Sequence, residues 1–116
     1  MNTLLVMIGG AVGAAARYHL GRLIGQGTPF PLGTLAVNVI GGLLMGLLIA
    51  RGPDDSVRLL VGAGLLGGFT TFSAFSLETV SMLQAGAVPL AIIYVAASVI
   101  GACLALWCGL MMGRLV

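Results

Sequence analysis

Residues 67–78 (GGFTTFSAFSLE) combine two glycines, several hydroxyl side chains, spaced phenylalanines and one carboxylate inside an otherwise apolar stretch. In hydrocarbon, a polar group without a partner costs several kcal/mol. Polar side chains at membrane depth therefore normally line a pore, a binding site or a packed interface. This segment is the first candidate for chemistry in the chain.

The same residues predict an interrupted helix. Gly67 and Gly68 are followed at once by hydroxyl-bearing residues, a pattern that favours a break over a smooth helix face. A break at membrane depth frees carbonyl groups at one half-helix end and N–H groups at the other, and these can bind cations and anions respectively. The leading hypothesis from the residues is ion handling.

Composition sets the broad class. Of 116 residues, 59% are hydrophobic and 7% are charged, with a mean hydropathy of +1.17, whereas soluble domains carry about 25% charged residues. A transmembrane helix needs about 20 apolar residues. We therefore expect an all-α membrane protein in which residues 1–116 form a single four-span domain. No charge precedes Arg17, so we expect the first span to be retained rather than removed as a signal peptide.

Turn residues divide the chain into four apolar segments. The segments are residues 3–17 or slightly beyond, about 32–50, 57 to about 84, and 89 to about 112. Asp54-Asp55-Ser56 offers caps and acidic first-turn residues for the third segment. Three pairs of glycines stand four residues apart, which predicts helix faces for close packing: Gly9/Gly13, Gly42/Gly46 and Gly64/Gly68.

The arginines predict a weak preference for one orientation. With four spans, Arg51, Arg58 and Arg114 share one side of the membrane, and Arg17 and Arg22 lie on the other. Because orientation follows the Lys/Arg excess near span ends, a bias of three against two barely decides it. We expect insertion in both orientations and a dual-topology, antiparallel homodimer. The alternative is that Arg17 fixes a single orientation.

Three motifs resemble a known family. Residues 9–14 (GGAVGA) leading to Arg17-Tyr18, residues 33–41 (GTLAVNVIG) and residues 67–73 (GGFTTFS) closely resemble the Fluc (CrcB) fluoride channels in order and spacing. The resemblance covers all four spans. It implies a dual-topology homodimer with two antiparallel pores, a passive fluoride-selective conductance, and a structural sodium ion at the dimer axis.

The resemblance gives pore roles to residues that also have ordinary structural explanations. Phe72 and Phe75 are three apart, so they share a helix face if the helix is regular there; such a pair is usually core. The resemblance points instead to the family's phenylalanine box, whose electropositive ring edges meet an anion. Asn38 stands one turn after Thr34 and resembles the pore-lining asparagine, although an interhelical hydrogen bond is the alternative.

Further roles follow from the same resemblance. Tyr94 and Ser98, one turn apart, resemble the family's hydroxyl track, whereas Ala102 lacks the hydroxyl that some relatives carry. The carbonyls of Gly67 and Thr70 from both subunits would bind the sodium ion, a hard cation that prefers oxygen ligands.

The remaining charged and sulfur-bearing residues receive provisional assignments. Arg17 resembles the family's vestibule arginine. For Glu78 we expect an interfacial carboxylate paired with an arginine or a helix end, with a permeation role as the alternative. Cys103 and Cys108 have no metal-ligand spacing, and we interpret them as packing residues.

These expectations combine into one function. The chain is expected to be a passive fluoride channel that exports fluoride across a bacterial plasma membrane, with the bilayer and a second copy as partners, no nucleic acid, and no enzymatic activity. One alternative is a small dual-topology multidrug transporter, but residues 1–23 contain no acid to couple transport. The other is a non-conducting membrane scaffold, in which glycines and polar residues serve packing alone.

Overall fold

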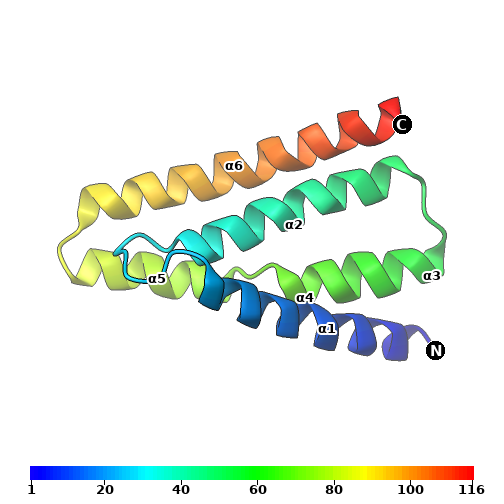
Figure 1. Ribbon diagram of the computed structural model, residues 1–116, viewed down its shortest axis with the longest axis horizontal. Helices are drawn as coiled ribbons and strands as arrows, with labels where there is room; N and C mark the ends of the chain where they lie inside the picture. Colours follow the sequence, from blue (N-terminus) through cyan, green and yellow to red (C-terminus); the bar gives the residue numbers. More distant parts are fainter.

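The helical spans run along the length of the molecule (Figure 1). The computed structural model describes all 116 residues, and four stretches are long and apolar enough to cross a membrane: α1 (Asn2–Leu23), α2 (Leu32–Ala50), the composite third span Asp55–Gln84, and α6 (Val88–Leu115). The longest dimension is 47 Å, more than the hydrocarbon thickness of about 30 Å. The all-α, four-span prediction is confirmed.

The third span is not a single regular helix. It comprises α3 (Asp55–Val57), the π-helix η1 (Arg58–Leu66), α4 (Gly67–Phe69) and α5 (Ser73–Gln84). The Asp54 carboxylate accepts the Val57 N–H at 2.9 Å, as a capping residue should. The sequence did not predict the π-helical turns.

The predicted break exists but begins after the glycines. Gly67 is helical, with φ −63° and ψ −40°, and the chain first leaves the helix at Thr70, where ψ is 157°. The interruption therefore lies inside the predicted GGFTTFS segment, and Gly68 serves close packing rather than an unusual backbone conformation. A Cβ added to Gly68 would lie 2.6 Å from the Gly10 carbonyl oxygen of α1.

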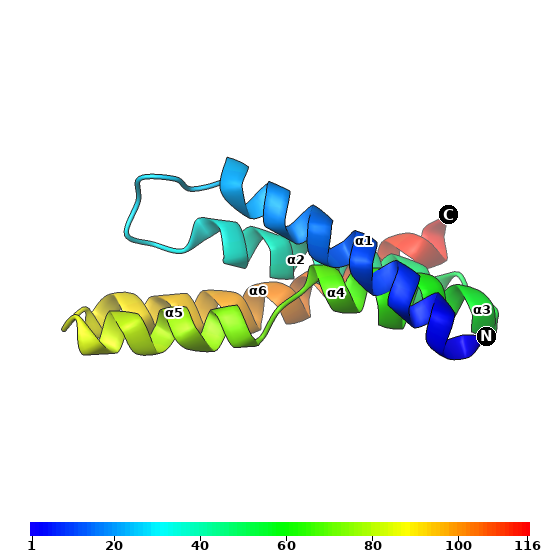
Figure 2. The ribbon, with the colours of Figure 1, turned by 90° about the horizontal axis from the view of Figure 1, so that it is seen from below.

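The break changes which helix the third span packs against. Before the interruption, η1 and α4 lie along α1; after it, α5 lies along α6. The end formed by the α1–α2 connection stands apart from the α5–α6 hairpin (Figure 2). The interruption therefore sits where the helices begin to separate.

Glycines form two seams between neighbouring helices. In the first, a Cβ on Gly9 or Gly13 would strike backbone carbonyls of η1; in the second, a Cβ on Gly46 would strike the Leu106 carbonyl of α6. Without space for a methyl group, the backbones touch directly. The close packing predicted from glycine spacing is confirmed.

Both termini and the connection from α2 to α3 lie at one end of the molecule (Figure 1). This arrangement places Arg51, Arg58 and Arg114 together, as the sequence predicted. Two boundaries differ from expectation, since α1 continues through Arg17, Tyr18 and His19 to Leu23 and α6 ends three residues later, at Leu115. The cluster at Arg17 is therefore helical.

Candidate functional site

Asn38 of α2 holds the interrupted segment by two hydrogen bonds. Its Oδ1 accepts the Thr71 N–H at 2.8 Å, and its Nδ2 donates to the Thr71 carbonyl at 3.0 Å. In a continuous helix, the Thr71 N–H would bind the carbonyl four residues earlier, which belongs to Gly67. The asparagine takes that donor and leaves the Gly67 carbonyl without its helical partner.

A second side chain has the same effect on a carbonyl three residues later. The Ala74 N–H donates to Thr71 Oγ1 at 3.2 Å rather than to the Thr70 carbonyl, its partner in a regular helix. No hydrogen bond of the backbone outside the helices uses the Gly67 or Thr70 oxygen. The break thus releases the two carbonyls that the resemblance had assigned to sodium.

Arg17 contacts the carbonyl between them. Its Nε donates to the Gly68 oxygen at 3.1 Å, from α1 across to the end of α4. Part of the guanidinium is therefore committed to the break, while the side chain also lines a pocket of about 200 Å³ with Tyr18, Thr34 and Thr71. The arginine therefore lines a small recess beside the break, and its vestibule role stays a prediction.

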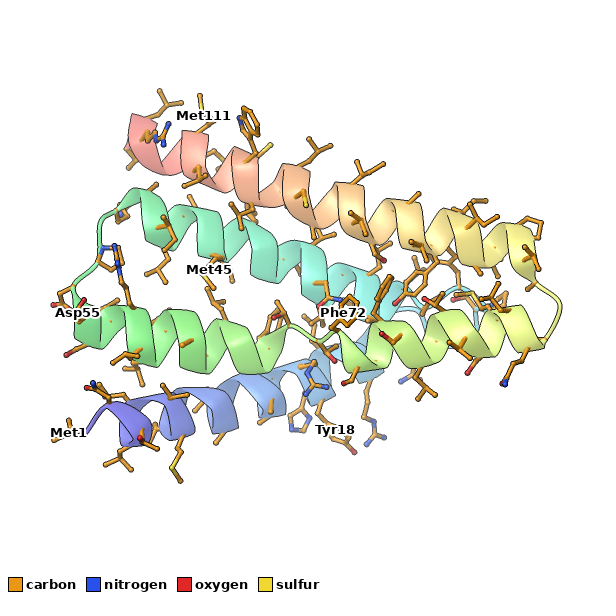
Figure 3. The ribbon with its side chains drawn as sticks, turned by 180° about the vertical axis from the view of Figure 1, so that it is seen from behind. Met1, Tyr18, Met45, Asp55, Phe72 and Met111 are labelled. Carbon is orange, nitrogen blue, oxygen red and sulfur yellow. The ribbon has the colours of Figure 1, made fainter.

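Thr71 also lines a larger cavity of about 480 Å³. Figure 3 labels two of its lining residues, Phe72 at the interruption and Met45 on α2. None of the lining side chains is charged; they are Asn38, Gly41, Gly42, Met45, Leu66, Thr70, Thr71, Phe72, Phe75, Ser98, Val99, Ala102, Cys103 and Leu106. The cavity therefore combines an apolar wall with neutral polar groups.

Three aromatic rings form a row beside this cavity. The ring centroids of Phe72 and Phe75 are 5.4 Å apart, and those of Phe75 and Tyr94 are 5.3 Å apart. Phe72 is 77% exposed, unusually high for a phenylalanine, whereas Tyr94 is fully buried. The two phenylalanines predicted to act together share the cavity wall, and Tyr94 lies behind them.

Two buried hydroxyls have no hydrogen-bond partner. These are Tyr94 Oη and Ser98 Oγ, one turn apart on α6 as expected. Buried polar groups are normally paired; these two hydroxyls lie close to each other, and Tyr94 Oη also lies close to Thr34 and Glu78, but none of these contacts has the geometry of a hydrogen bond. Ser98 lines the large cavity and Tyr94 does not. The predicted hydroxyl track therefore reaches the cavity at Ser98 alone.

Thr34 and Glu78 pair with each other. Thr34 Oγ1 donates to Glu78 Oε1 at 2.7 Å, joining α2 to α5. The hydrogen-bond partner that the structure gives Glu78 is this hydroxyl rather than the expected arginine or helix end, and a permeation role for Glu78 stays a prediction. Thr34 lines the smaller pocket, on the Arg17 side, rather than the cavity that holds Asn38.

The cysteines also differ from expectation. Both are exposed rather than packed, since α6 touches α2 through other positions such as Gly109. Cys103 lines the large cavity, which sequence reasoning missed. Cys103 lies four residues after Val99 and three before Leu106, and this spacing could have indicated that the three share a helix face.

A four-span membrane protein with an interrupted helix beside a neutral polar cavity is the class that the fold and site define. The chain matches the protein-family model described as "CrcB-like protein, Camphor Resistance (CrcB)" over residues 4–110. It belongs to this family, as the resemblance of its motifs indicated.

Individual relatives agree with this assignment. The chain is 50% identical to the fluoride-specific ion channel FluC of Novosphingobium aromaticivorans, over 97% of this chain and 95% of the relative. It is also 50% identical to FluC of Caulobacter vibrioides, with the same coverage, and 47% identical to FluC of Mesorhizobium japonicum, over 97% and 96%. These relatives are named as channels, which agrees with the expectation that the chain is not an enzyme. With its four apolar helices, the chain is a multi-pass membrane protein.

Proposed function

We propose that this protein is a passive, fluoride-selective channel of the bacterial plasma membrane and that fluoride passes through the large cavity. The observation that carries the proposal is the uncharged cavity beside the break, which holds an orphan Ser98 hydroxyl and the Asn38 amide. The names of the relatives supply the identity of the ion.

The cavity has the chemistry that a small anion needs. Fluoride is strongly hydrated, so a conduit must replace its water with hydrogen-bond donors and positive ring edges. The Asn38 amide has a second N–H beyond the one used by Thr71, and Phe72 and Phe75 supply ring edges. Neutral donors bind an anion weakly enough for it to leave, whereas a buried counter-charge would trap it.

The arginine pocket supplies attraction at one side of the cavity. Arg17 and Thr34 line the smaller pocket, and Thr71 lines both. An anion would meet the guanidinium first and the neutral donors next. The direction of net flux follows from weak-acid chemistry, because HF crosses the bilayer, dissociates in a less acidic cytoplasm and leaves fluoride to be exported.

The proposal includes an antiparallel homodimer with a structural sodium ion. The carbonyls of Gly67 and Thr70 lack hydrogen-bond partners outside the helices, and free backbone oxygens fit a hard monovalent cation. Each subunit would contribute this pair, and the bound ion would supply positive charge near the anion paths. The nearly balanced arginines, three against two, support insertion in both orientations.

Reconstitution tests the function. Purified protein in potassium-loaded liposomes, with sodium present, should release fluoride rapidly after valinomycin is added and release almost no chloride. Equal release of both anions would contradict selectivity for fluoride. No fluoride release from a folded protein supplied with sodium would exclude a fluoride channel and favour a non-conducting scaffold.

A further inference from the structure

We propose that Cys103 is a covalent modification site in the cavity wall, and that small thiol-specific electrophiles acting there block fluoride conduction. This inference rests on the proposed function, since it places a reactive group beside the proposed ion path. It adds a site and a ligand class: thiosulfonates and small disulfides with an anionic head.

The position of Cys103 makes its sulfur accessible. The residue is exposed, and it lines the cavity of about 480 Å³ that also contains Asn38 and Phe72. Val99, Cys103 and Leu106 follow one face of α6 at helical spacing. The thiol therefore stands on the cavity side of the helix, next to space that an added group can fill.

A second observation indicates that this space accepts a polar ligand. Ser98, on the same helix and the same cavity, is 6% exposed, and its hydroxyl has no partner. Across the cavity, one N–H of the Asn38 amide is uncommitted. Ser98 lies five residues before Cys103, about 7.5 Å along the helix axis and about 140° around it, so the two are linked through the cavity that both line. A thiol reagent with an anionic head therefore finds both a sulfur and a hydrogen-bond donor.

The reaction balances without a further co-reactant. Water takes the thiol proton, and the Cys103 thiolate attacks the sulfenyl sulfur of a methanethiosulfonate. A protein–reagent S–S bond forms, the S–SO₂ bond breaks, and methanesulfinate leaves with the electron pair. Because the thiolate forms only where water reaches the sulfur, modification also reports that the cavity is hydrated.

Cys108 provides a matched control within the chain. It lies five residues beyond Cys103, which turns it by about 140° around the helix. It is also exposed, yet it does not line the cavity. We expect this second thiol to face lipid in the bilayer, where a charged reagent does not dissolve. The two cysteines therefore differ in water access rather than in chemistry.

The experiment uses the whole reconstituted protein and 2-sulfonatoethyl methanethiosulfonate. Wild type, C103S and C108S are treated, and each is compared with its own untreated sample for fluoride efflux, for the modified peptide by mass spectrometry, and for oligomeric size. Wild type and C108S should gain the adduct at Cys103 and lose efflux by more than about tenfold, as when a narrow pore is filled. A reducing agent should restore both, and C103S should keep its own untreated rate.

Other results overturn the inference. An unmodified Cys103, an adduct that leaves efflux unchanged, or a lost efflux that accompanies dissociation of the protein would each do so. Failure of the proposed function is distinguishable, because untreated wild type would then show no fluoride efflux at all. The inference fails instead when untreated protein conducts and treatment has no effect on the path.

Discussion

The glycine seams and the interrupted segment join helices in opposite ways. Along the seams, backbones touch because Gly13 and Gly46 carry no side chain, and a Cβ would strike carbonyls of the neighbouring helix. At residues 70–72, side chains from other helices replace hydrogen bonds that the helix has lost, with Asn38 and Arg17 contacting Thr71 and Gly68. The seams depend on the absence of side chains, whereas the interrupted segment depends on hydrogen bonds from side chains.

The two regions also differ in whether their polar groups are free to bind a ligand. A seam satisfies its own backbone within each helix, so its polar groups are unavailable to a ligand. The break gives up helical hydrogen bonds, and only part of that loss is repaired by Asn38, Thr71 and Arg17. The unrepaired carbonyls of Gly67 and Thr70 and the orphan Ser98 hydroxyl lie beside the repair. The structure thus keeps its uncommitted polar groups at one place.

Asn38→Ala should give the largest effect. It leaves both the N–H and the carbonyl of Thr71 without their partner, a loss of about 1–3 kcal/mol for each group. We expect fluoride efflux to fall by about a hundredfold, the equivalent of 2.8 kcal/mol, in liposome assays. Gln84→Ala on exposed α5 is the control. Unchanged efflux would show that the two hydrogen bonds between Asn38 and Thr71 are not needed for conduction.

Gly46→Ala tests the seam. The new methyl group meets the Leu106 carbonyl, and overpacking of this kind costs about 1–3 kcal/mol. Thermal unfolding in detergent should show reduced stability. Gly21→Ala is the matched control, because nothing lies within 4 Å of its added Cβ and alanine favours a helix by about 1 kcal/mol over glycine. Equal thermal stability of the two variants would contradict the claim that Gly46 is held in close contact and Gly21 is not.

Thr34→Val tests whether the hydrogen bond beside the smaller pocket contributes to stability. The substitution keeps the shape but removes the donor to Glu78 Oε1, and hydrogen bonds to charged groups contribute about 1.5–3 kcal/mol. Stability should fall by an amount near the lower limit, since both groups are only half-buried. Thr34→Ser, which keeps the hydroxyl, should restore most of it. A serine variant as unstable as the valine variant would contradict this role of the hydroxyl.

Ser98→Ala should have the smallest effect and the clearest interpretation. Its hydroxyl has no protein partner, so its removal should leave the melting temperature unchanged or slightly higher. Loss of one neutral hydrogen bond, about 1 kcal/mol, should lower fluoride efflux about fivefold. A serine that only fills space would give the opposite pattern, with full efflux retained.

The sequence predicted the seams better than the break. Four apolar segments, the Asp54 cap and the paired glycines depend on local composition and spacing, and the structure confirms them. The location of the break depends on Asn38, 33 positions from Thr71, and no local pattern records that partner. For the same reason the pairing of Thr34 with Glu78, 44 positions apart, was missed.

The long fourth span shows a second limit of sequence reasoning. Apolar residues surround α6 on every side, so periodicity does not reveal which face packs. Cys103 was therefore assigned to packing, although it lines the cavity. The family resemblance brought Asn38, Phe72, Phe75 and Ser98 into one candidate site, and the structure places these four on one cavity; their role in conduction is a prediction.

The reversal potential of the reconstituted protein tests the central claim most directly. In a planar bilayer with a fluoride gradient, equal chloride and equal sodium on both sides, current through a passive fluoride channel should reverse at the fluoride equilibrium potential and follow it as the gradient changes. A reversal potential that stays near zero as the fluoride gradient changes, which is where equal chloride or equal sodium would hold it, or the absence of current from correctly folded protein, would contradict the account.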